Sequence, residues 1–330
     1  MNSVGRLFRI SIFGESHGEC VGITIDGCPA GLSLSPEDLL ADLDRRKGGK
    51  QKGTTPRQEE DYPIFKSGVF NGKTTGFPIT ILFENKNTRS EDYNQQRSIP
   101  RPGHADWVAH QKFGGNEDYR GGGHFSARLT AGIVAAGALA KKLMPGVNVE
   151  AVITEIAGEA DTEKGLQKAI DAKDSVGGII ECRVNGLTTG LGEPYFNSIE
   201  SSLAHIVFAI PAVRGIEFGT GFAAARMFGS QHNDSIENMD GKTLTNHAGG
   251  VVGGITNGNE LVFRLAIKPT SSTPKEQNSL NWDTKQMENF SIRGRHDLCV
   301  ALRAPVIVEA VTAIVLADFM LLEQRIKRVN

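Results

Sequence analysis

The sequence is poor in cysteine and in aromatic side chains. Cysteine accounts for four of the 330 residues, and 7% of the residues are aromatic. Neither a CxxC pair nor a cysteine–histidine cluster with zinc spacing is present, so no metal site is predicted. Free thiols in the cytoplasm are the simplest interpretation of Cys20, Cys28, Cys182 and Cys299. The few aromatic residues provide no stacking platform for single-stranded nucleic acid.

Net charge and long apolar runs are lacking as well. The 36 basic and 38 acidic residues give a formal net charge of −2, which argues against bulk attraction to nucleic acid or to an acidic membrane. Residues 1–18 lack the apolar core of a signal peptide. The apolar stretch at 131–140 is short, and the last predicted helix carries Glu309 and Asp318, so no membrane span is expected. A soluble, cytoplasmic protein without nucleic-acid or membrane partners is predicted.

Glycine, in contrast, is abundant, with 39 residues. Three of them, Gly121–Gly123, run directly into a predicted helix for which Ser126 is a good N-cap and which should end near Met144. Glycine lets a ligand approach the backbone, and a helix N-terminus attracts anions, to which Arg128 adds a full charge. The stretch is therefore either a phosphate or flavin site or a loop that only lets a helix pack closely.

Two histidines lie in turns rather than on apolar stripes. Strands are predicted at 7–13 and 21–25, and the tip of their hairpin holds His17. The proline- and glycine-rich loop at 97–106 should be rigid and presents His104 near Asp106. Either histidine can serve as an acid near neutral pH, whereas the alternative for His17 is a capping role in the turn.

A basic run follows a helix that Ser35 and Pro36 should open as N-cap and first residue. Residues 45–57 contain six basic side chains and no acidic one, with three glycines among them. This run is either a solvated face or a flexible lid over a small polyanion. The segment 268–272, with one lysine and three hydroxyl groups, offers further donors to an anion.

The remaining pattern indicates a mixed α+β fold. Residues 63–70 and 77–84 are predicted to form strands joined by a turn at Asn71–Gly72. Further strands are expected at 147–156, 178–184 and 261–267, and further helices at 161–172, 198–210 and 306–329.

Six motifs in a fixed order resemble the chorismate synthase family over essentially the whole chain. They are GESHG, RPGHAD, YRGGG with a following SAR, NHAGG with a following GG, KPTSS and GRHD. The resemblance implies a single domain, 1–330, folded as a β-α-β sandwich with helices between antiparallel sheets and assembled as a homotetramer. It also implies a lyase that converts 5-enolpyruvylshikimate 3-phosphate to chorismate and phosphate by anti-1,4-elimination. Reduced FMN is required without net redox change, and NADPH is needed only indirectly, as its source.

The resemblance also assigns roles to residues. His17 would lie by the leaving phosphate, His104 by the flavin pyrimidine ring, and Asp297 would help to remove the flavin N5 proton. The flavin contacts carried over are His124, Phe125, Ser126, Gly253, Lys268, Pro269, Thr270, Ser271, Ser272 and Arg295. The substrate or NADP contacts carried over are Ser16, Arg46, Lys52 and Arg128.

The sequence departs from the family pattern at four of its positions. Lys52 replaces a second arginine, His124 and Phe125 replace an arginine and a serine, and Leu298 replaces a proline. A lysine at 52 would provide a point charge instead of a bidentate fork. Changes at 124 and 125 would matter only if those contacts use side chains.

Two other function classes compete with the lyase. The basic run could bind a phosphate-rich ligand or RNA without chemistry, and the near-neutral charge counts against this. The second competing class is an NADPH-linked flavin oxidoreductase. Against this class, the chain has no GxGxxG motif that follows a strand and opens a helix.

Overall fold

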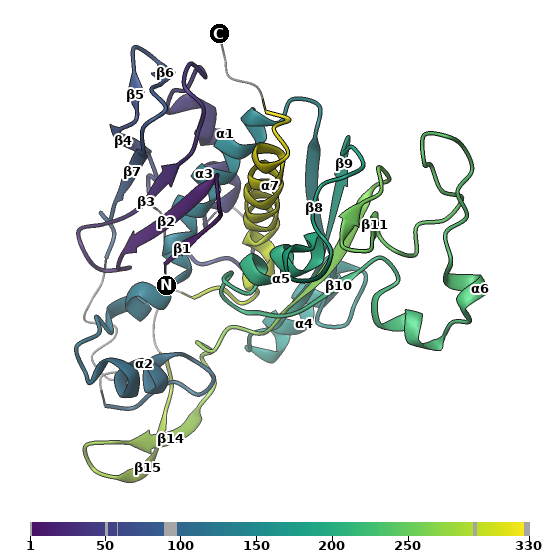
Figure 1. The fold of residues 1–330 in the computed structure, drawn as a ribbon. Coiled ribbons are helices and arrows are strands. Elements are labelled where there is room, and N and C mark those ends of the chain that lie inside the picture. Colours follow the sequence, from purple (N-terminus) through teal and green to yellow (C-terminus); the bar gives the residue numbers. More distant parts are fainter. Residues whose placement is uncertain (1, 50–51, 58, 89–97, 293–295, 327–330) are drawn as a thin grey trace.

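The computed structural model describes residues 2–49, 52–57, 59–88, 98–292 and 296–326. Two antiparallel sheets enclose a layer of helices (Figure 1). The first sheet has the strand order β1-β2-β3-β7-β4, with β1 at Ser3–Val4, β2 at Arg9–Gly14, β3 at Cys20–Asp26, β7 at Ile79–Glu84 and β4 at Ile64–Ser67. The second has the order β10-β13-β9-β8, with β10 at Val213–Phe218, β13 at Leu261–Ile267, β9 at Gly178–Asn185 and β8 at Asn148–Ile156.

The layer between the sheets is built on α3 (Thr130–Leu143) and α7 (Pro305–Leu322). The helices approach closely because Gly137 has no side chain: a Cβ there would lie 2.3 Å from Ala310. Helix α7 is long and apolar enough to cross a membrane, yet 78% of it is buried inside the fold, as expected for a core helix. The predicted arrangement of helices between antiparallel sheets is therefore the arrangement observed.

Shorter elements surround this sandwich. Their helices are α1 (Glu37–Arg46), α2 (Asp106–Phe113), α4 (Thr162–Ala172), α5 (Ile199–Val207) and α6 (Gly229–His232). Their strands form three two-stranded ribbons: β5 (Val69–Phe70) with β6 (Lys73–Thr74), β11 (Val251–Val252) with β12 (Ile255–Thr256), and β14 (Gln277–Asn281) with β15 (Gln286–Phe290). Short 3-10 turns occur at Arg120–Phe125, Ala127–Leu129, Tyr195–Asn197, Gly221–Arg226 and Val300–Arg303.

Several predicted boundaries are wrong. The strand expected at 63–70 is divided at Gly68, and the Asn71–Gly72 turn closes the small β5–β6 ribbon, not a hairpin of β4 and β7. The final helix ends at Leu322 and not at 329, and α5 ends at Val207 and not at 210.

Two helix starts also differ from prediction. Helix α1 begins at Glu37, with Pro36 as a cap in helical geometry, and the backbone N–H of Ser35 just before it donates to Asp38 Oδ2 at 2.8 Å. Ser126 does cap, accepting from the N–H of Arg128, but it caps the 3-10 turn before α3, and α3 itself starts at Thr130.

Candidate active site

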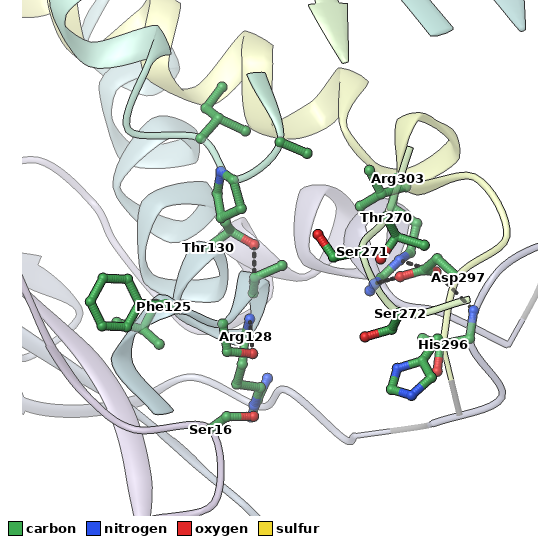
Figure 2. Close-up of a pocket in the computed structure, with 18 of the residues that line it drawn as sticks. Ser16, Phe125, Arg128, Thr130, Thr270, Ser271, Ser272, His296, Asp297 and Arg303 are labelled. Carbon is green, nitrogen blue, oxygen red and sulfur yellow. Dashed lines mark hydrogen bonds and ion pairs between the residues drawn. The ribbon is translucent and has the colours of Figure 1, made fainter. Parts of the chain in front are cut away.

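One cavity of about 550 Å³ lies beside the first turn of α3 and the 3-10 turn that precedes α7. Figure 2 shows Ser16 and Arg128 on one side of it and Ser272, His296 and Asp297 on the other. Loops from both sheets meet here. Of the predicted site residues, those lining the cavity are Ser16, Arg46, His104, His124, Phe125, Ser126, Arg128, Lys268, Pro269, Thr270, Ser271, Ser272 and Asp297.

The three glycines at 121–123 make room for histidine rings. All three have a positive φ, a backbone conformation that residues with a side chain rarely adopt. A Cβ at Gly121 would lie 2.4 Å from Cδ2 of His17, and one at Gly122 would lie 3.4 Å from the ring of His104. His17 itself is 93% buried in the loop between β2 and β3, directly behind Gly121. The loop therefore places both histidines against the same stretch of backbone.

His104 is oriented by a hydrogen bond to a carboxylate. Its Nδ1 lies 2.6 Å from Asp106 Oδ1, so this nitrogen carries the proton and Nε2 is left as the second reactive atom. Arg101 donates to the same carboxylate at 2.7 and 2.8 Å, and it also donates to Ser272 Oγ at 3.2 Å. Burial lowers the pKa of His104 and outweighs the opposing effect of Asp106, whereas the pKa of Asp106 is held far below its usual range despite burial. The resting imidazole is neutral at pH 7.

A single carboxylate holds two buried arginines in the cavity wall. Arg46 Nη2 donates to Asp61 Oδ2 at 2.5 Å, and Arg128 Nη1 donates to Asp61 Oδ1. Arg128 is further fixed by Asn85 Oδ1, at 2.8 Å from its Nε. Burial would raise the pKa of Asp61, but the two guanidinium groups outweigh it and hold that pKa below its ordinary value. Two fixed cations thus face the cavity.

Asp297 is fixed on the opposite side. Arg303 binds it with two N–H groups, at 2.5 Å and 3.1 Å, and the N–H of Thr55 donates to Oδ1 at 2.8 Å. The Thr55 contact ties the described part of the basic run to the GRHD motif. The backbone N–H of Leu298 adds a second tie, to the carbonyl of Gly53 at 2.9 Å.

The KPTSS segment is attached to the RPGHAD loop. Lys268 Nζ donates to the carbonyl of Gly103 and to Ser271 Oγ, both at 2.9 Å. Burial, with help from Arg214, lowers the pKa of Lys268. Two motifs separated by more than 160 residues therefore form one wall.

Comparison with known proteins decides the family. A family model described as chorismate synthase matches residues 8–321. A chorismate synthase of Chitinophaga pinensis is 68% identical over 330 residues, covering 100% of this chain and 99% of that protein. One of Dehalococcoides mccartyi is 44% identical, covering 99% of each chain. A solved crystal structure of chorismate synthase, 29% identical, superposes with a TM-score of 0.70 over 97% of this chain and 93% of that one.

The chain belongs to the chorismate synthase family. The predicted family, the α+β sandwich and the enzyme class, a carbon–oxygen lyase acting on phosphates, are confirmed. The family uses a reduced flavin.

Two of the residues that depart from the chorismate synthase pattern, His124 and Phe125, have local partners. His124 Nδ1 lies 2.8 Å from the carbonyl oxygen of Gly14, to which it donates, so this ring is fixed to the end of β2. Phe125 is 43% exposed and packs against Phe113 of α2, with ring centroids 6.4 Å apart. Both line the cavity, so each can contact a ligand through its side chain.

Besides the buried His17, two predicted site residues within the described part of the chain do not line this cavity. Lys52 extends away from it and donates to Gln167 Oε1 of α4 at 3.1 Å. Gly253 lies in the β11–β12 turn, where a Cβ would meet nothing within 4 Å. Arg295 lies outside the described residues.

Sequence reasoning missed Asp61, Arg303 and the role of Arg57 in the site. Arg57 Nη1 donates to Ser16 Oγ at 3.2 Å, and its Nη2 pairs with Glu59 at 2.7 Å. Asp61 and Glu59 lie just after the basic run in the sequence. An acidic cluster that follows six basic residues was the available signal, because buried cations need counter-charges.

The cavity suits a flavin phosphate and a second anion. Its volume falls within the range of small-molecule sites. Nε of Arg46 is buried and has no hydrogen-bond partner within the described part of the chain, so a donor is available to a ligand. Lys268, the hydroxyl groups beside it and the exposed face of Phe125 provide a cation, donors and an aromatic surface. The residues present therefore fit the cofactor that the family uses.

Proposed function

We propose that the chain converts 5-enolpyruvylshikimate 3-phosphate to chorismate and inorganic phosphate, using reduced FMN. The observation that carries this proposal is the convergence of Arg46, Arg128, His104 and Asp297 on one cavity, beside the buried His17. The reaction breaks the C3–O bond to phosphate and a C6–H bond, on opposite faces of the ring. Its substrate carries a phosphate and two carboxylates, which match a cavity with fixed guanidinium groups.

Binding of the substrate falls to Arg46, Arg128 and Ser16. The guanidinium groups are already desolvated and oriented, so little ordering is needed when an anion enters. Electrostatic attraction is strong here because the cavity wall is buried.

His17 and His104 supply protons at two places. His17, which lies behind Gly121, would donate to the oxygen of the departing phosphate. His104, with Nδ1–H fixed on Asp106, would act through Nε2 on the bound cofactor, whose negative charge would favour the imidazolium form. The carboxylate of Asp297 is oriented by Arg303 to accept a proton.

Reduced FMN would be held by Lys268–Ser272, His124, Phe125 and Ser126, with Gly253 and Arg295 as further predicted contacts. When bound, the cofactor supplies an electron-rich ring that supports elimination without net redox change. The protein contributes position, charge and exclusion of water.

Anaerobic turnover with reduced FMN tests the proposal. We expect chorismate, followed by its ultraviolet absorbance, and phosphate in equal amounts. His17→Ala and His104→Ala should each lower kcat by about 100-fold, the usual scale of general acid catalysis. Absence of both products under these conditions would reject the lyase function, and full activity of either variant would reject its acid role.

The source of reduced flavin is a separate question with its own assay. We propose that NADPH acts only indirectly, through another enzyme. Bleaching of FMN absorbance on mixing the protein with NADPH would overturn this part and favour the oxidoreductase alternative.

We also propose a cytoplasmic homotetramer with neither nucleic-acid nor membrane partners. Support for the assembly comes from a long segment, residues 219–250, which we term the arm. The arm extends away from the second sheet (Figure 1) and carries exposed Phe222 and Phe228. Such apolar exposure on a projecting segment favours burial against another copy.

A further inference from the structure

Asp61 is a buried carboxylate to which the family resemblance assigns no role. It is 98% buried, lies on the cavity wall and contacts a different arginine with each oxygen. Its backbone has φ of 49°, a left-handed conformation that aspartate and asparagine tolerate better than most residues. The chain thus adopts an uncommon backbone geometry at the point where the carboxylate meets both cations.

Without Asp61 the two guanidinium groups would repel each other in a desolvated wall. Among the described residues, Arg46 has one other side-chain hydrogen-bond partner, Thr130 Oγ1, at 3.4 Å. Arg128 retains Asn85 and the carbonyl of Glu84, so it depends on Asp61 less than Arg46 does. The three ionised groups together carry one net positive charge, which a buried wall tolerates better than two.

We infer that Asp61 is a positioning residue that holds Arg46 and Arg128 in the geometry that binds the anionic groups of the substrate. This inference rests on the proposed function. Asp61 acts through the two arginines, and each guanidinium keeps N–H groups for a ligand, including Nε of Arg46.

Asp61→Asn is the conservative test, because asparagine keeps the size and tolerates the backbone. Its amide oxygen can accept from one arginine, but its NH₂ group faces the N–H groups of the other. We expect KM for the substrate to rise by about 100-fold while kcat falls by less than 10-fold, since the arginines bind ground state and transition state alike. A loss of kcat with unchanged KM would indicate a merely structural role and overturn the inference.

Calorimetric binding of inorganic phosphate gives a readout that does not need turnover. Phosphate affinity should fall by at least 10-fold in Asp61→Asn, and equal affinity in both proteins would overturn the inference. If the wild-type protein gives no turnover, the proposed function fails, whereas the phosphate comparison still decides the role of Asp61.

Asp318→Asn is the matched control. Asp318 is a buried aspartate, away from the cavity, that accepts from the N–H groups of Leu7 and Phe8 at 2.6 and 2.8 Å. It should lower thermal stability and leave KM and phosphate affinity unchanged.

The Arg46→Gln background keeps the test decisive if Asp61→Asn alone does not fold. Arg46→Gln removes one cation. The variant that combines Arg46→Gln with Asp61→Asn therefore keeps one buried guanidinium group and the same net positive charge as the wild-type cluster. Because part of the action of Asp61 runs through Arg46, Asp61→Asn should cost about 10-fold in KM in this background instead of about 100-fold. No additional rise in KM over Arg46→Gln would overturn the inference.

Discussion

Gly121 illustrates how one missing side chain shapes the site. The glycine run before α3 has two interpretations from sequence, an anion-binding loop or a packing device. In the structure Gly121 meets the His17 ring, and a Cβ there would overlap Cδ2 at 2.4 Å. The glycine makes room for the ring of His17, to which we have proposed an acid role, and neither interpretation had included this.

Gly121→Ala should therefore impair catalysis more than stability. The added methyl group pushes His17 out of place and also strains a backbone with φ of 61°. We expect kcat to fall by at least 10-fold, measured under anaerobic turnover. Gly146→Ala is the matched control, because Gly146 has φ of 91° but open space around its Cβ position. It imposes the same kind of backbone strain, worth about 1–3 kcal/mol, and should leave kcat unchanged. Equal kcat losses in both variants would contradict the role of Gly121.

At the scale of elements, a buried charge cluster fixes the end of α1 against the central helices. Glu309 of α7 is 98% buried and accepts from Arg45 at 2.6 and 2.7 Å and from Lys141 of α3 at 2.8 Å. Arg45 immediately precedes Arg46, so this cluster sets where the last turn of α1 delivers its cavity arginine. Burial would raise the pKa of Glu309, but Arg45 and Lys141 outweigh it and hold that pKa below its ordinary value.

Glu309→Gln should destabilise the fold by about 2 kcal/mol at pH 7, because the neutral amide weakens the charge-assisted hydrogen bonds from Arg45 and Lys141, which are partly exposed and keep Asp42 as a partner. Since the folded-state pKa is lowered, the stabilisation is present above the ordinary carboxyl pKa and is lost as pH falls through the folded value. The difference between wild type and variant should thus shrink on acidification. Urea unfolding at pH 7 and at lower pH measures it. The partly exposed Glu260–Arg183 pair provides the control, and Glu260→Gln should cost less than about 1 kcal/mol. A similar small cost for Glu309→Gln would contradict this account.

Which elements could be predicted follows from how they are stabilised. Most strands of the two main sheets and α3 carry their own periodicity or propensity, so the sequence indicates them, whereas β10 of the second sheet was not predicted. The β14–β15 hairpin does not, because its strands, QNSLN and QMENF, show no clear apolar alternation and pair largely through their backbones. Helix α2 was missed because the proline- and glycine-rich loop before it suggested only a loop.

Site residues, too, could be predicted only where the sequence carries a local signal for them. Motif residues such as His104 could be located by resemblance, and the cavity brings most of them together. Asp61 could not, because its importance arises from burial between two arginines 15 and 67 residues away in the chain. In the sequence, a carboxylate within an acidic run looks like a solvent-exposed surface residue, and only the folded structure shows that it is buried.

At the scale of the whole molecule, the arm carries a group of exposed apolar side chains. Side chains of this segment that remain largely exposed are Phe222, Phe228, Ile236, Met239 and Leu244. Asp234 links two parts of the arm by accepting from the N–H groups of His247 and Ala248 at 2.8 and 2.9 Å, and at its base the N–H of Gly219 donates to the carbonyl of Val262 in β13 at 2.9 Å. A projecting segment with a fixed base and an apolar surface is suited to pack against a neighbouring copy of the chain.

Phe222→Ser combined with Phe228→Ser should therefore weaken assembly. The two phenyl groups are 80% and 77% exposed in the single chain, so their replacement removes little from the fold itself but much from an interface. Light scattering after size exclusion should give four times 35.5 kDa for the wild type and a smaller mass for the variant, with an unchanged far-ultraviolet circular dichroism spectrum. Phe77→Ser is the control, because Phe77 is 74% exposed and precedes β7 in the first sheet, outside the arm. Its mass should remain that of the wild type. A tetramer that survives both substitutions in the arm would place the interface elsewhere, and a wild type of 35.5 kDa would reject the assembly.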